Sequence, residues 1–381
     1  MSDNVPFDIQ REIIKLLPVK PLLRFRQVSK SWKSLIDSPH FIANYHFSDV
    51  TLQHHILVRY YDLKHEQYVS IVDDDHCFPR HKSPLIVPSD ASLLGEFPDI
   101  IGSSQGVLCL CYKKRSCETN TFVLWNPTIR KSVPIVVPNV FNNTEFQTAV
   151  GFGVCPCTSD PKLVKINYIS SLQFNPEKCI PSQVEIFNLN SGSWKTFSSM
   201  SMPRKSIELT WYQVCVDKFI YWVAADRTLA GQTIRKKKLI LSFDVITEEF
   251  TEIDLPNNLA YLDDHCLHLS KLFTSLIVLE SERGVRKNGR CCAWRMEYGV
   301  RNSFTKLYEI KSPSDSLAIT RVHDFRKTGE PIIEMLFTER RGSAVFSYEP
   351  GSGEITDTGI DGGGFLCLAK SYIETLLLLD Q

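Results

Sequence analysis

Residues 5–36 read VPFDIQREIIKLLPVKPLLRFRQVSKSWKSLI, and this stretch decides how the chain begins. Pro6 suits the first position of a helix, where its missing N–H group is no loss. Four apolar residues then recur at the spacing of one helical face, namely Ile9, Ile13, Leu16 and Leu17. The stretch therefore predicts a first short helix with one apolar side.

Two further helices are indicated by the residues that bound them. Pro18 ends the first helix and Pro21 opens the second, because proline lacks the donor that a helix interior needs. Ser29 is a suitable N-cap for the third. The apolar residues of these two helices are Leu22, Leu23, Phe25 and Val28, followed by Trp32, Leu35 and Ile36.

So small a helical unit cannot bury this many large apolar side chains. Domains of about forty residues are usually marginal without a staple or a partner. One interpretation is a helical cap that packs on the rest of the chain. The other is a docking module whose surplus apolar surface fits another protein. Exposure of Leu22, Leu23 and Trp32 would favour docking, and their burial against the following domain would favour a cap.

The stretch also resembles the F-box, in the form found in plants. The resemblance lies in an ordered run of matching residues, with two mild departures at Val5 and Gln27. A fourth short helix of the same family corresponds to SPHFIANYHF, residues 38–47. The matching run is Leu17, Pro18, Val19, Lys20, Pro21, Leu22, Leu23, Arg24, Phe25, Arg26, Val28, Ser29, Lys30, Ser31 and Trp32.

This resemblance implies an adaptor-docking domain over residues 1–47. Its partner would be a Skp-family adaptor, and through it the cullin and RING subunits of an SCF ubiquitin ligase. Residues 1–40 carry more Lys and Arg than Asp and Glu, which suits the acidic adaptor of that family. By resemblance, the adaptor-binding residues are Pro6, Ile9, Ile13, Leu17, Pro18, Leu22, Leu23, Val28 and Trp32, some of which must instead hold the helices together.

The composition indicates a globular protein in a reducing compartment. Lys plus Arg and Asp plus Glu both number 43, and this neutral balance argues against a nucleic-acid or membrane-surface partner. No apolar run is long enough to span a membrane, and the N-terminus has no signal-peptide pattern. The 12 Cys residues without such a signal imply free thiols and a cytoplasmic or nuclear location, or both.

After residue 47 the pattern changes from helical spacing to short β-rich runs. Five segments read as hairpins, each an alternating strand, a polar or glycine-containing turn, and a second strand. They are residues 122–135, 184–197, 239–253, 292–310 and 344–360, and a weaker copy spans 55–72. Aromatic landmarks in these six units recur every 50 to 65 residues or so, close to the kelch repeat of about 50.

A β-propeller of about six kelch-type blades is therefore the predicted architecture for residues 48–381. The remaining strands of each blade would come from runs that precede the hairpins, at residues 106–112, 162–169, 214–224, 272–280 and 332–338. The segment from Phe365 to Leu379 would supply a closing strand. A pair of β-sandwiches or an irregular β-domain is the competing arrangement. The whole chain is thus of the α+β multidomain class, with a small N-terminal domain of three or four helices before an all-β domain.

The β-rich part resembles the F-box-associated domain of plant proteins. The resemblance covers about residues 100–310 and lies in four segments that occur in the family's order. They are GSSQGVLCL, WNPTIRKSVPI, VGFGVCPCTSDPKLVKI and FIYWVA. In this family the domain binds a target protein, so the resemblance implies a substrate-recognition domain whose target is unknown.

Catalytic and metal-binding motifs are not indicated. The close cysteine pairs, such as Cys109 with Cys111, are not of the CxxC kind and have no second pair at zinc-finger spacing. Cys109 and Cys111 fit one face of a strand, where a buried thiol acts as a small hydrophobe. We expect no catalytic residue, no metal and no cofactor.

Three functional hypotheses follow. The first is a non-catalytic substrate receptor of an SCF ligase, which marks a target protein for ubiquitination and proteasomal degradation. The second is an F-box scaffold or regulator that acts without ubiquitination. The third is a propeller enzyme with a helical cap.

Overall fold

The computed structural model describes residues 5–45, 53–61, 66–74, 76–89, 98–111, 121–137, 146–169, 182–197, 203–204, 206–226, 236–262, 267–281, 289–297, 303–314, 316–337, 342–361 and 368–378. Four helices come first: α1 (Phe7–Lys15), α2 (Val19–Phe25), α3 (Lys30–Ile36) and α4 (Pro39–Tyr45). The strands follow, and the only helix between them in the described residues is the short α5 (Asn257–Ala260). The predicted helical domain of three or four helices is confirmed. The predicted boundary between residues 47 and 48 falls outside the described residues and stays a prediction.

The first two helices begin one and two residues away from their predicted starts. Pro6 is the N-cap of α1 instead of its first helical residue, and Pro18 is the N-cap of α2. Pro21 lies within the first turn of α2, where backbone N–H groups have no helical partner in any case. Ser29 caps α3 as predicted, because its Oγ accepts a hydrogen bond from the Trp32 backbone N–H at 3.1 Å.

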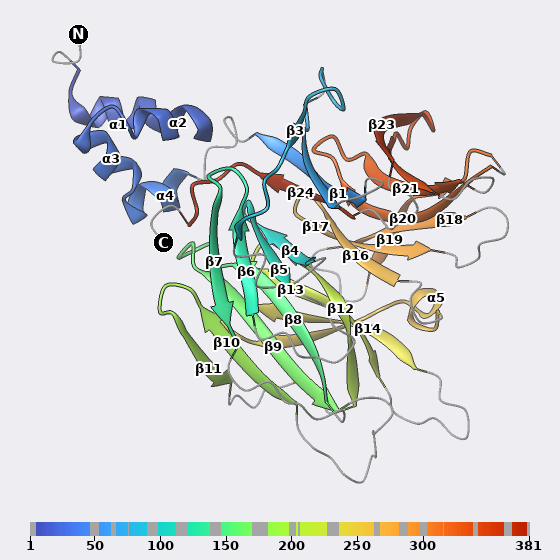
Figure 1. Cartoon of the computed structure of the whole chain (residues 1–381). Coiled ribbons are helices and arrows are strands. Elements are labelled where there is room, and N and C mark those ends of the chain that lie inside the picture. Colours follow the sequence, from blue (N-terminus) through green and yellow to red (C-terminus); the bar gives the residue numbers. More distant parts are fainter. Residues whose placement is uncertain are drawn as a thin grey trace.

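The strands form six four-stranded antiparallel sheets, the blades of a propeller (Figure 1). Blade 1 has the order β24-β1-β2-β3, and blades 2 to 6 each use four consecutive strands. The bounds are β1 (His54–Tyr61), β2 (Glu66–Val72), β3 (Lys82–Pro84) and β24 (Leu368–Ile373) in blade 1; β4 (Asp99–Ser104), β5 (Val107–Cys111), β6 (Thr121–Asn126) and β7 (Lys131–Val136) in blade 2; and β8 (Phe146–Val154), β9 (Pro161–Ile169), β10 (Gln183–Asn188) and β11 (Ser193–Phe197) in blade 3. They are β12 (Ile207–Val216), β13 (Phe219–Asp226), β14 (Lys237–Asp244) and β15 (Phe250–Asp254) in blade 4; β16 (Leu267–Leu272), β17 (Ser275–Ser281), β18 (Arg290–Met296) and β19 (Phe304–Lys311) in blade 5; and β20 (Leu317–Phe325), β21 (Pro331–Phe337), β22 (Ser343–Tyr348) and β23 (Ile355–Asp361) in blade 6.

The predicted propeller of about six blades is thus confirmed, with its closing strand. β24 pairs antiparallel with β1, with His54 opposite Ile373 and Arg59 opposite Leu368. The first blade is therefore built from both ends of the domain. The inner strands of the blades are β24, β4, β8, β12, β16 and β20, which contact one another around the axis.

Five of the six predicted hairpins are the third and fourth strands of blades 2 to 6. The weaker copy, residues 55–72, is also a hairpin, formed by β1 and β2. It occupies the second and third positions of blade 1, because the inner position is taken by β24. The sixth hairpin was therefore predicted correctly as a pair of strands. It lies one strand closer to the propeller axis than the other five hairpins do in their blades.

The two faces of the propeller differ in their connections. Because neighbouring strands are antiparallel, the first and third strands of a blade end on one face, and the second and fourth strands end on the other. The first face has tight turns such as Gln105–Gly106, Asp217–Lys218 and Phe273–Thr274, whereas the strand ends on the second face, such as Ile169 with Gln183 and Asp226 with Lys237, are further apart in the sequence. β1 begins and β24 ends on the tight-turn face, so the helices are attached there.

The core lies between adjacent blades and is filled by aromatic and aliphatic side chains. Trp125 and Trp222 are fully buried, as are the two cysteines of β5, Cys109 and Cys111, which supports their predicted role as small core hydrophobes. Trp194, Trp211 and Trp294 are partly buried at the edges of these clusters.

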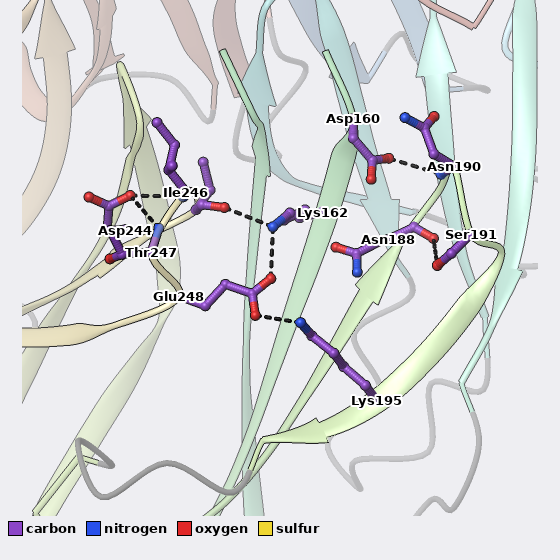
Figure 2. A network of polar contacts seen from close by, with 11 residues as sticks. Asp160, Lys162, Asn188, Asn190, Ser191, Lys195, Asp244, Ile246, Thr247 and Glu248 are labelled. Carbon is purple, nitrogen blue, oxygen red and sulfur yellow. Dashed lines mark hydrogen bonds and ion pairs between the residues drawn. The ribbon is translucent and has the colours of Figure 1, made fainter. Parts of the chain in front are cut away.

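A polar seam joins blades 3 and 4 on the tight-turn face (Figure 2). Glu248, in the turn between β14 and β15, accepts hydrogen bonds from Lys162 on β9 at 2.8 Å and from Lys195 on β11 at 2.5 Å. Lys162 also donates to the Val245 carbonyl at 2.8 Å. Burial raises the pKa of the Glu248 carboxyl, but the two lysines outweigh it and hold that pKa below its ordinary value. The seam therefore ties a turn of one blade to two strands of the next.

Candidate functional site

The first helix turns its apolar stripe toward solvent. Ile9, Ile13 and Leu16 are 51%, 52% and 61% exposed, whereas Ile14, on the other side of α1, is only 3% exposed. An amphipathic helix normally places such a stripe against the core. The stripe of α1 therefore lacks a covering element among the residues that the structure describes.

This outward surface continues beyond α1. Val5 and Phe7 are exposed before and at the start of the helix, and Val28 is 68% exposed after α2. Half of the exposed large hydrophobic side chains in the described residues lie between Val5 and Val28. Apolar side chains so concentrated in one small domain indicate an interaction surface. We call Val5, Phe7, Ile9, Ile13, Leu16 and Val28 the helical surface.

Polar contacts hold the helices in place around their own small core. Arg26, after α2, donates to both carboxylate oxygens of Asp37, one of them at 2.9 Å from Nη2. The Tyr45 hydroxyl on α4 donates to the Leu17 carbonyl at 2.7 Å. These contacts join both ends of the helical domain, so the helical surface is presented on a defined scaffold.

The nine predicted adaptor-binding residues divide into three groups by exposure. Leu22 is fully buried and contributes to the core cluster that also holds Ile36 and Phe41. Burial of Leu22 in the free chain is the outcome that favours the cap interpretation, whereas the helical surface, made of other residues, favours docking. The exposed group is Pro6, Ile9, Ile13 and Val28, and the half-buried group is Leu17, Pro18, Leu23 and Trp32. The docking role of all nine stays a prediction.

Three members of the helical surface were absent from the predicted set. Leu16 follows Ile13 at helical spacing and was part of the predicted stripe, so its spacing was a sufficient signal for including it. Val5 and Phe7 flank the N-cap Pro6, outside the periodic pattern. Only the structure shows that they are exposed.

The helices reach the propeller through the segment that follows β24 (Figure 1). Lys20 on α2 forms an ion pair with Glu374 at 2.9 Å, and His55 Nε2 lies 3.1 Å from the same carboxylate oxygen. One cluster of buried apolar residues contains Phe41 and Tyr45 of α4 together with Leu376, Leu377 and Leu378. We call residues 374–378 the C-terminal segment.

The charge of Glu374 is stabilised where the two domains meet. Its side chain is 3% exposed, and burial alone would raise the pKa of the carboxyl. The hydrogen bonds from His55 and Lys20 outweigh that effect and lower the pKa. Burial raises the pKa of the nearby Tyr45 phenol, and the negative charge of Glu374 adds to the increase. The ionised Glu374 thus links the helical domain to blade 1.

Asn126 holds the other side of the C-terminal segment. Its Nδ2 donates to the carbonyl oxygens of Thr375 at 3.0 Å and Leu377 at 2.8 Å. Its Oδ1 accepts hydrogen bonds from the backbone N–H groups of Thr128 and Ile129. One buried amide therefore shapes the turn between β6 and β7 and fastens the C-terminal segment to blade 2.

Comparison with known families assigns both parts of the chain. Residues 2–44 match the F-box domain, and residues 97–308, more than half of the chain, match the F-box associated beta propeller domain. The chain belongs to this family of F-box proteins. The resemblance predicted from the sequence is thereby confirmed for both domains.

Relatives of this F-box protein include several from Arabidopsis thaliana. F-box protein CPR1 is 23% identical over 337 residues, covering 81% of this chain and 74% of its own length. F-box/WD-40 repeat-containing protein 1 is 24% identical over 382 residues, covering 92% and 82%. A third F-box relative is 27% identical over 261 residues, and the chain spans only 62% of its length.

Solved structures resemble the F-box protein distantly. The β-propeller domain of the Trilobed protease from Pyrococcus furiosus is 8% identical, with a TM-score of 0.36 over 79% of this chain and 78% of that one. The Hadza microbial sialidase Hz136 is 7% identical, with a TM-score of 0.42 over 75% and 64%. These likenesses concern the fold and carry no argument about activity.

The structure explains why two segments that resemble the family, Trp-Asn-Pro at residues 125–127 and Gly-Phe-Gly at residues 151–153, carry these residue types. The asparagine of the Trp-Asn-Pro motif is Asn126, which holds the C-terminal segment. The two glycines of the Gly-Phe-Gly motif are Gly151 and Gly153 on β8, where an added Cβ would lie 2.2 Å from Trp222 Cζ2 and 3.1 Å from Cys215 Sγ, respectively. The glycines therefore let blade 3 approach blade 4 closely.

The described residues show neither a metal-ligand cluster nor a membrane-spanning helix. They contain no group of three or more His, Cys, Asp or Glu side chains arranged to hold a metal ion. No described helix combines the length and the apolar character needed to cross a membrane.

Proposed function

We propose that this F-box protein is the substrate-recognition subunit of an SCF ubiquitin ligase. The pairing of an F-box with a propeller domain supports a receptor that joins an adaptor to a target protein. The F-box would bind the Skp-family adaptor, and the propeller would bind the target for ubiquitination and proteasomal degradation. The target-binding residues stay unassigned.

The observation that carries this proposal is the helical surface. Ile9, Ile13 and Leu16 form an apolar stripe that faces solvent in a chain whose first domain is an F-box. Covering these side chains would remove a large apolar area from water, at roughly 25 cal/mol per Å². An adaptor is the partner that the family implies for this surface.

The position of the F-box on the propeller supports a proposal for which face of the propeller binds the target. The F-box joins the propeller on the tight-turn face, through Lys20 and the C-terminal segment. That face is partly occupied by the helices, and the strands that end on the opposite face are separated by longer stretches of sequence. Long loops on a rigid scaffold commonly carry recognition residues. The target would therefore bind on the face opposite the F-box.

Such a receptor acts by proximity and needs no nucleophile of its own. Bound through the adaptor to cullin and RING subunits, it would raise the local concentration of a target lysine near the ubiquitin-charged enzyme. The neutral composition supports a protein partner over nucleic acid or a membrane. The proposed location is the cytoplasm, the nucleus or both.

The adaptor half is tested by a binding measurement with a purified Skp-family adaptor and the full chain. Ile13→Asp combined with Val28→Asp places charge on two exposed residues of the helical surface. A charge enclosed in an apolar interface costs several kcal/mol, and a micromolar complex has only about 8 kcal/mol of binding free energy. We therefore expect binding to be lost. Leu22 is unsuitable for this test, because a charge at that buried position would disrupt the helices themselves.

The matched control is Ile86→Asp combined with Phe273→Asp, which charges two apolar residues of the propeller that are 73% and 68% exposed. This variant should bind like the wild type, and both variants should keep the wild-type circular dichroism. A well-folded wild type that does not bind the adaptor would overturn the docking proposal and favour the helical cap.

The ligase half is tested in cells of the source organism. The variant that carries Ile13→Asp and Val28→Asp should still bind targets but should no longer bind the adaptor. Proteins that co-purify with this variant in larger amounts than with the wild type would be candidate targets, because they are bound but are no longer ubiquitinated. Their ubiquitination should depend on the wild-type chain. Adaptor binding without any protein whose ubiquitination or abundance depends on the chain would support the scaffold hypothesis instead.

A further inference from the structure

The inner strands approach one another unevenly around the propeller axis. β4 contacts both β8 and β12, although β8 belongs to the blade between them. A Cβ added to Gly102 on β4 would lie 1.9 Å from Gln213 Nε2 on β12. Ser104 on β4 donates to Cys215 Sγ on β12 at 3.5 Å. Blades 2, 3 and 4 are therefore packed tightly at the axis.

The other three inner strands carry cations at the axis. Lys271 lies on β16, Arg321 on β20 and Lys370 on β24, the inner strands of blades 5, 6 and 1. The guanidinium carbon of Arg321 lies 5.9 Å from the ring centre of Tyr212 on β12. Because blade 5 separates these two blades, Arg321 must extend across the axis to reach Tyr212. The side chain thus projects into the centre of the ring.

Apart from the contact of Arg321 with the Tyr212 ring, the side chains of these three cations form no ion pair or hydrogen bond with the residues that the structure describes. The acidic side chains of the described inner strands are engaged elsewhere. Asp99 pairs with Arg59, and Glu208 pairs with Lys236. An unpaired cation that is partly shielded from water is costly, so an incoming anion would be stabilised there.

Asp324 on β20 is the acidic residue whose charge acts on Lys370, and its oxygens already accept hydrogen bonds. Oδ1 accepts from the Ser270 hydroxyl at 3.1 Å, and Oδ2 accepts from the Ser371 backbone N–H at 2.8 Å and its hydroxyl at 2.9 Å. These bonds tie blades 5, 6 and 1 together at the axis. Asp324 therefore offsets part of the positive charge without forming an ion pair with any of the three cations.

The electrostatic balance at Lys370 agrees with this geometry. Burial lowers the pKa of its ammonium group, and the positive charges of Lys271 and Arg321 lower it further. Asp324 opposes them, yet the pKa of Lys370 stays below its ordinary value. The buried Lys370 ammonium group therefore lies near one carboxylate, that of Asp324, and two further cations.

We propose that Lys271, Arg321 and Lys370 form a binding site for an anionic group, a carboxylate or a phosphate, at the axis of the propeller. The Arg321 guanidinium can donate two parallel hydrogen bonds to such a group, and the two ammonium groups add charge. The anion would come from an acidic segment of a bound polypeptide or from a free small molecule. This site lies in the propeller and does not depend on adaptor docking.

The test is calorimetric binding of two probes to the full chain at low salt, namely pyrophosphate and a hexaglutamate peptide. We expect the wild type to bind at least one probe, with an affinity that falls as salt is added. Arg321→Gln and Lys370→Met should each weaken binding by about tenfold or more. Lys370→Arg, which keeps the charge, should retain binding. Lys311→Met is the matched control, because Lys311 lies on the outer strand β19 with its side chain 75% exposed. This variant should bind both probes as the wild type does.

The probe that binds identifies the source of the anion. Pyrophosphate alone indicates a small molecule, and hexaglutamate indicates a polypeptide segment. The site would be excluded if a folded wild type bound neither probe, or if Arg321→Gln and Lys370→Met bound as tightly as the wild type. Adaptor binding by Arg321→Gln should equal that of the wild type, so failure of this site and failure of the proposed function are distinguishable.

Discussion

Gly151 lies on β8 where blade 3 meets blade 4, and the space beside its Cα is already filled. An added Cβ would lie 2.2 Å from Trp222 Cζ2 and 2.8 Å from Ile220 Cγ2. The indole cannot move away easily, since it is fully buried and its Nε1 donates to the Val150 carbonyl at 3.2 Å. Gly151→Ala should therefore lower the free energy of unfolding by about 1–3 kcal/mol, measured by urea denaturation.

The control for this substitution is Gly351→Ala. The nearest atom to an added Cβ at that position is Glu349 Oε1 at 3.1 Å, the far end of a flexible side chain. Its free energy of unfolding should stay within about 0.5 kcal/mol of the wild type. Equal urea midpoints for both variants would show that the close approach of the two blades does not require glycine at position 151.

The ion pair between Lys20 and Glu374 predicts a pH-dependent stability. The pKa of Glu374 is lower in the folded chain than its ordinary value of 4.5, so the ionised form favours folding. That contribution is complete above pH 4.5 or so and is lost as the pH falls through the lowered folded pKa. Lys20→Met should therefore lower the melting temperature at neutral pH, and its difference from the wild type should shrink on acidification.

Lys30→Met is the control for this pH series, because Lys30 is exposed and makes no ion pair with a described residue. Its melting curve should follow that of the wild type at every pH. A deficit of Lys20→Met that stayed constant down to pH 3 or below would mean that the ion pair does not provide the stability.

The sequence predicted single residues well where local chemistry decides their role. Ser29 was recognised as an N-cap from its type and position, and Cys109 and Cys111 from their alternation along a strand. The side of α1 that faces outward was not predictable in this way. Periodicity shows that Ile9 and Ile13 share a face, but only the packing of the other helices determines whether that face is covered.

At the scale of elements, the C-terminal segment governs how the F-box is held. Asn126 makes two hydrogen bonds to it and two more to its own turn. Asn126→Ala removes all four and leaves buried carbonyl groups without a donor, which costs about 1–3 kcal/mol per group. We expect faster hydrogen exchange in α4 and in the C-terminal segment, with the strands of blades 4 and 5 unchanged.

Asn190→Ala is the matched control, because Asn190 lies in the equivalent turn of blade 3 and is exposed. The backbone N–H of Asn190 donates a hydrogen bond to Asp160 Oδ1 at 2.9 Å, and alanine retains this donor. Exchange in α4 should not change in this variant. Unchanged exchange in Asn126→Ala as well would show that the apolar contacts of Leu376, Leu377 and Leu378 suffice to hold the helices.

Hairpins were predictable because they are local, and the assembly of blade 1 was not. Turn residues and alternating strands identified the pairs of blades 2 to 6. In the hairpin of residues 55–72, the landmark Tyr60 lies on the second strand of its blade instead of the third. This explains why the interval from Tyr60 to Trp125 is the longest of the series. Position within a blade depends here on pairing with residues far away in the sequence.

At the scale of the whole molecule, closure of the ring rests on β24. Removal of residues 368–381 would leave β1 without its inner neighbour and would remove the C-terminal segment from between the helices and blade 2. We expect the truncated chain to lose cooperative thermal unfolding and to bind a hydrophobic dye. A truncated chain that unfolds as cooperatively as the full chain would show that the other five blades are stable without closure.

The number of blades was also predictable at this scale, because each blade repeats one pattern of strands and turns at a regular interval. The relation between the two domains was not. It depends on one ion pair, one asparagine and one apolar cluster, formed by residues as distant in the sequence as Lys20 and Glu374. Neither residue belongs to a pattern that would connect them.

Closure by β24 also has a consequence for how the protein is made. The ribosome releases β1 early and β24 only after most of the chain, tens of seconds later at about 5–20 residues per second. During that interval the F-box helices are complete while the edge of β1 remains open, so the nascent chain would need chaperones to protect that edge. A message with a premature stop codon before Leu368 would yield a polypeptide that still displays the helical surface without a finished receptor. Such a polypeptide would be able to compete with the intact protein for the adaptor.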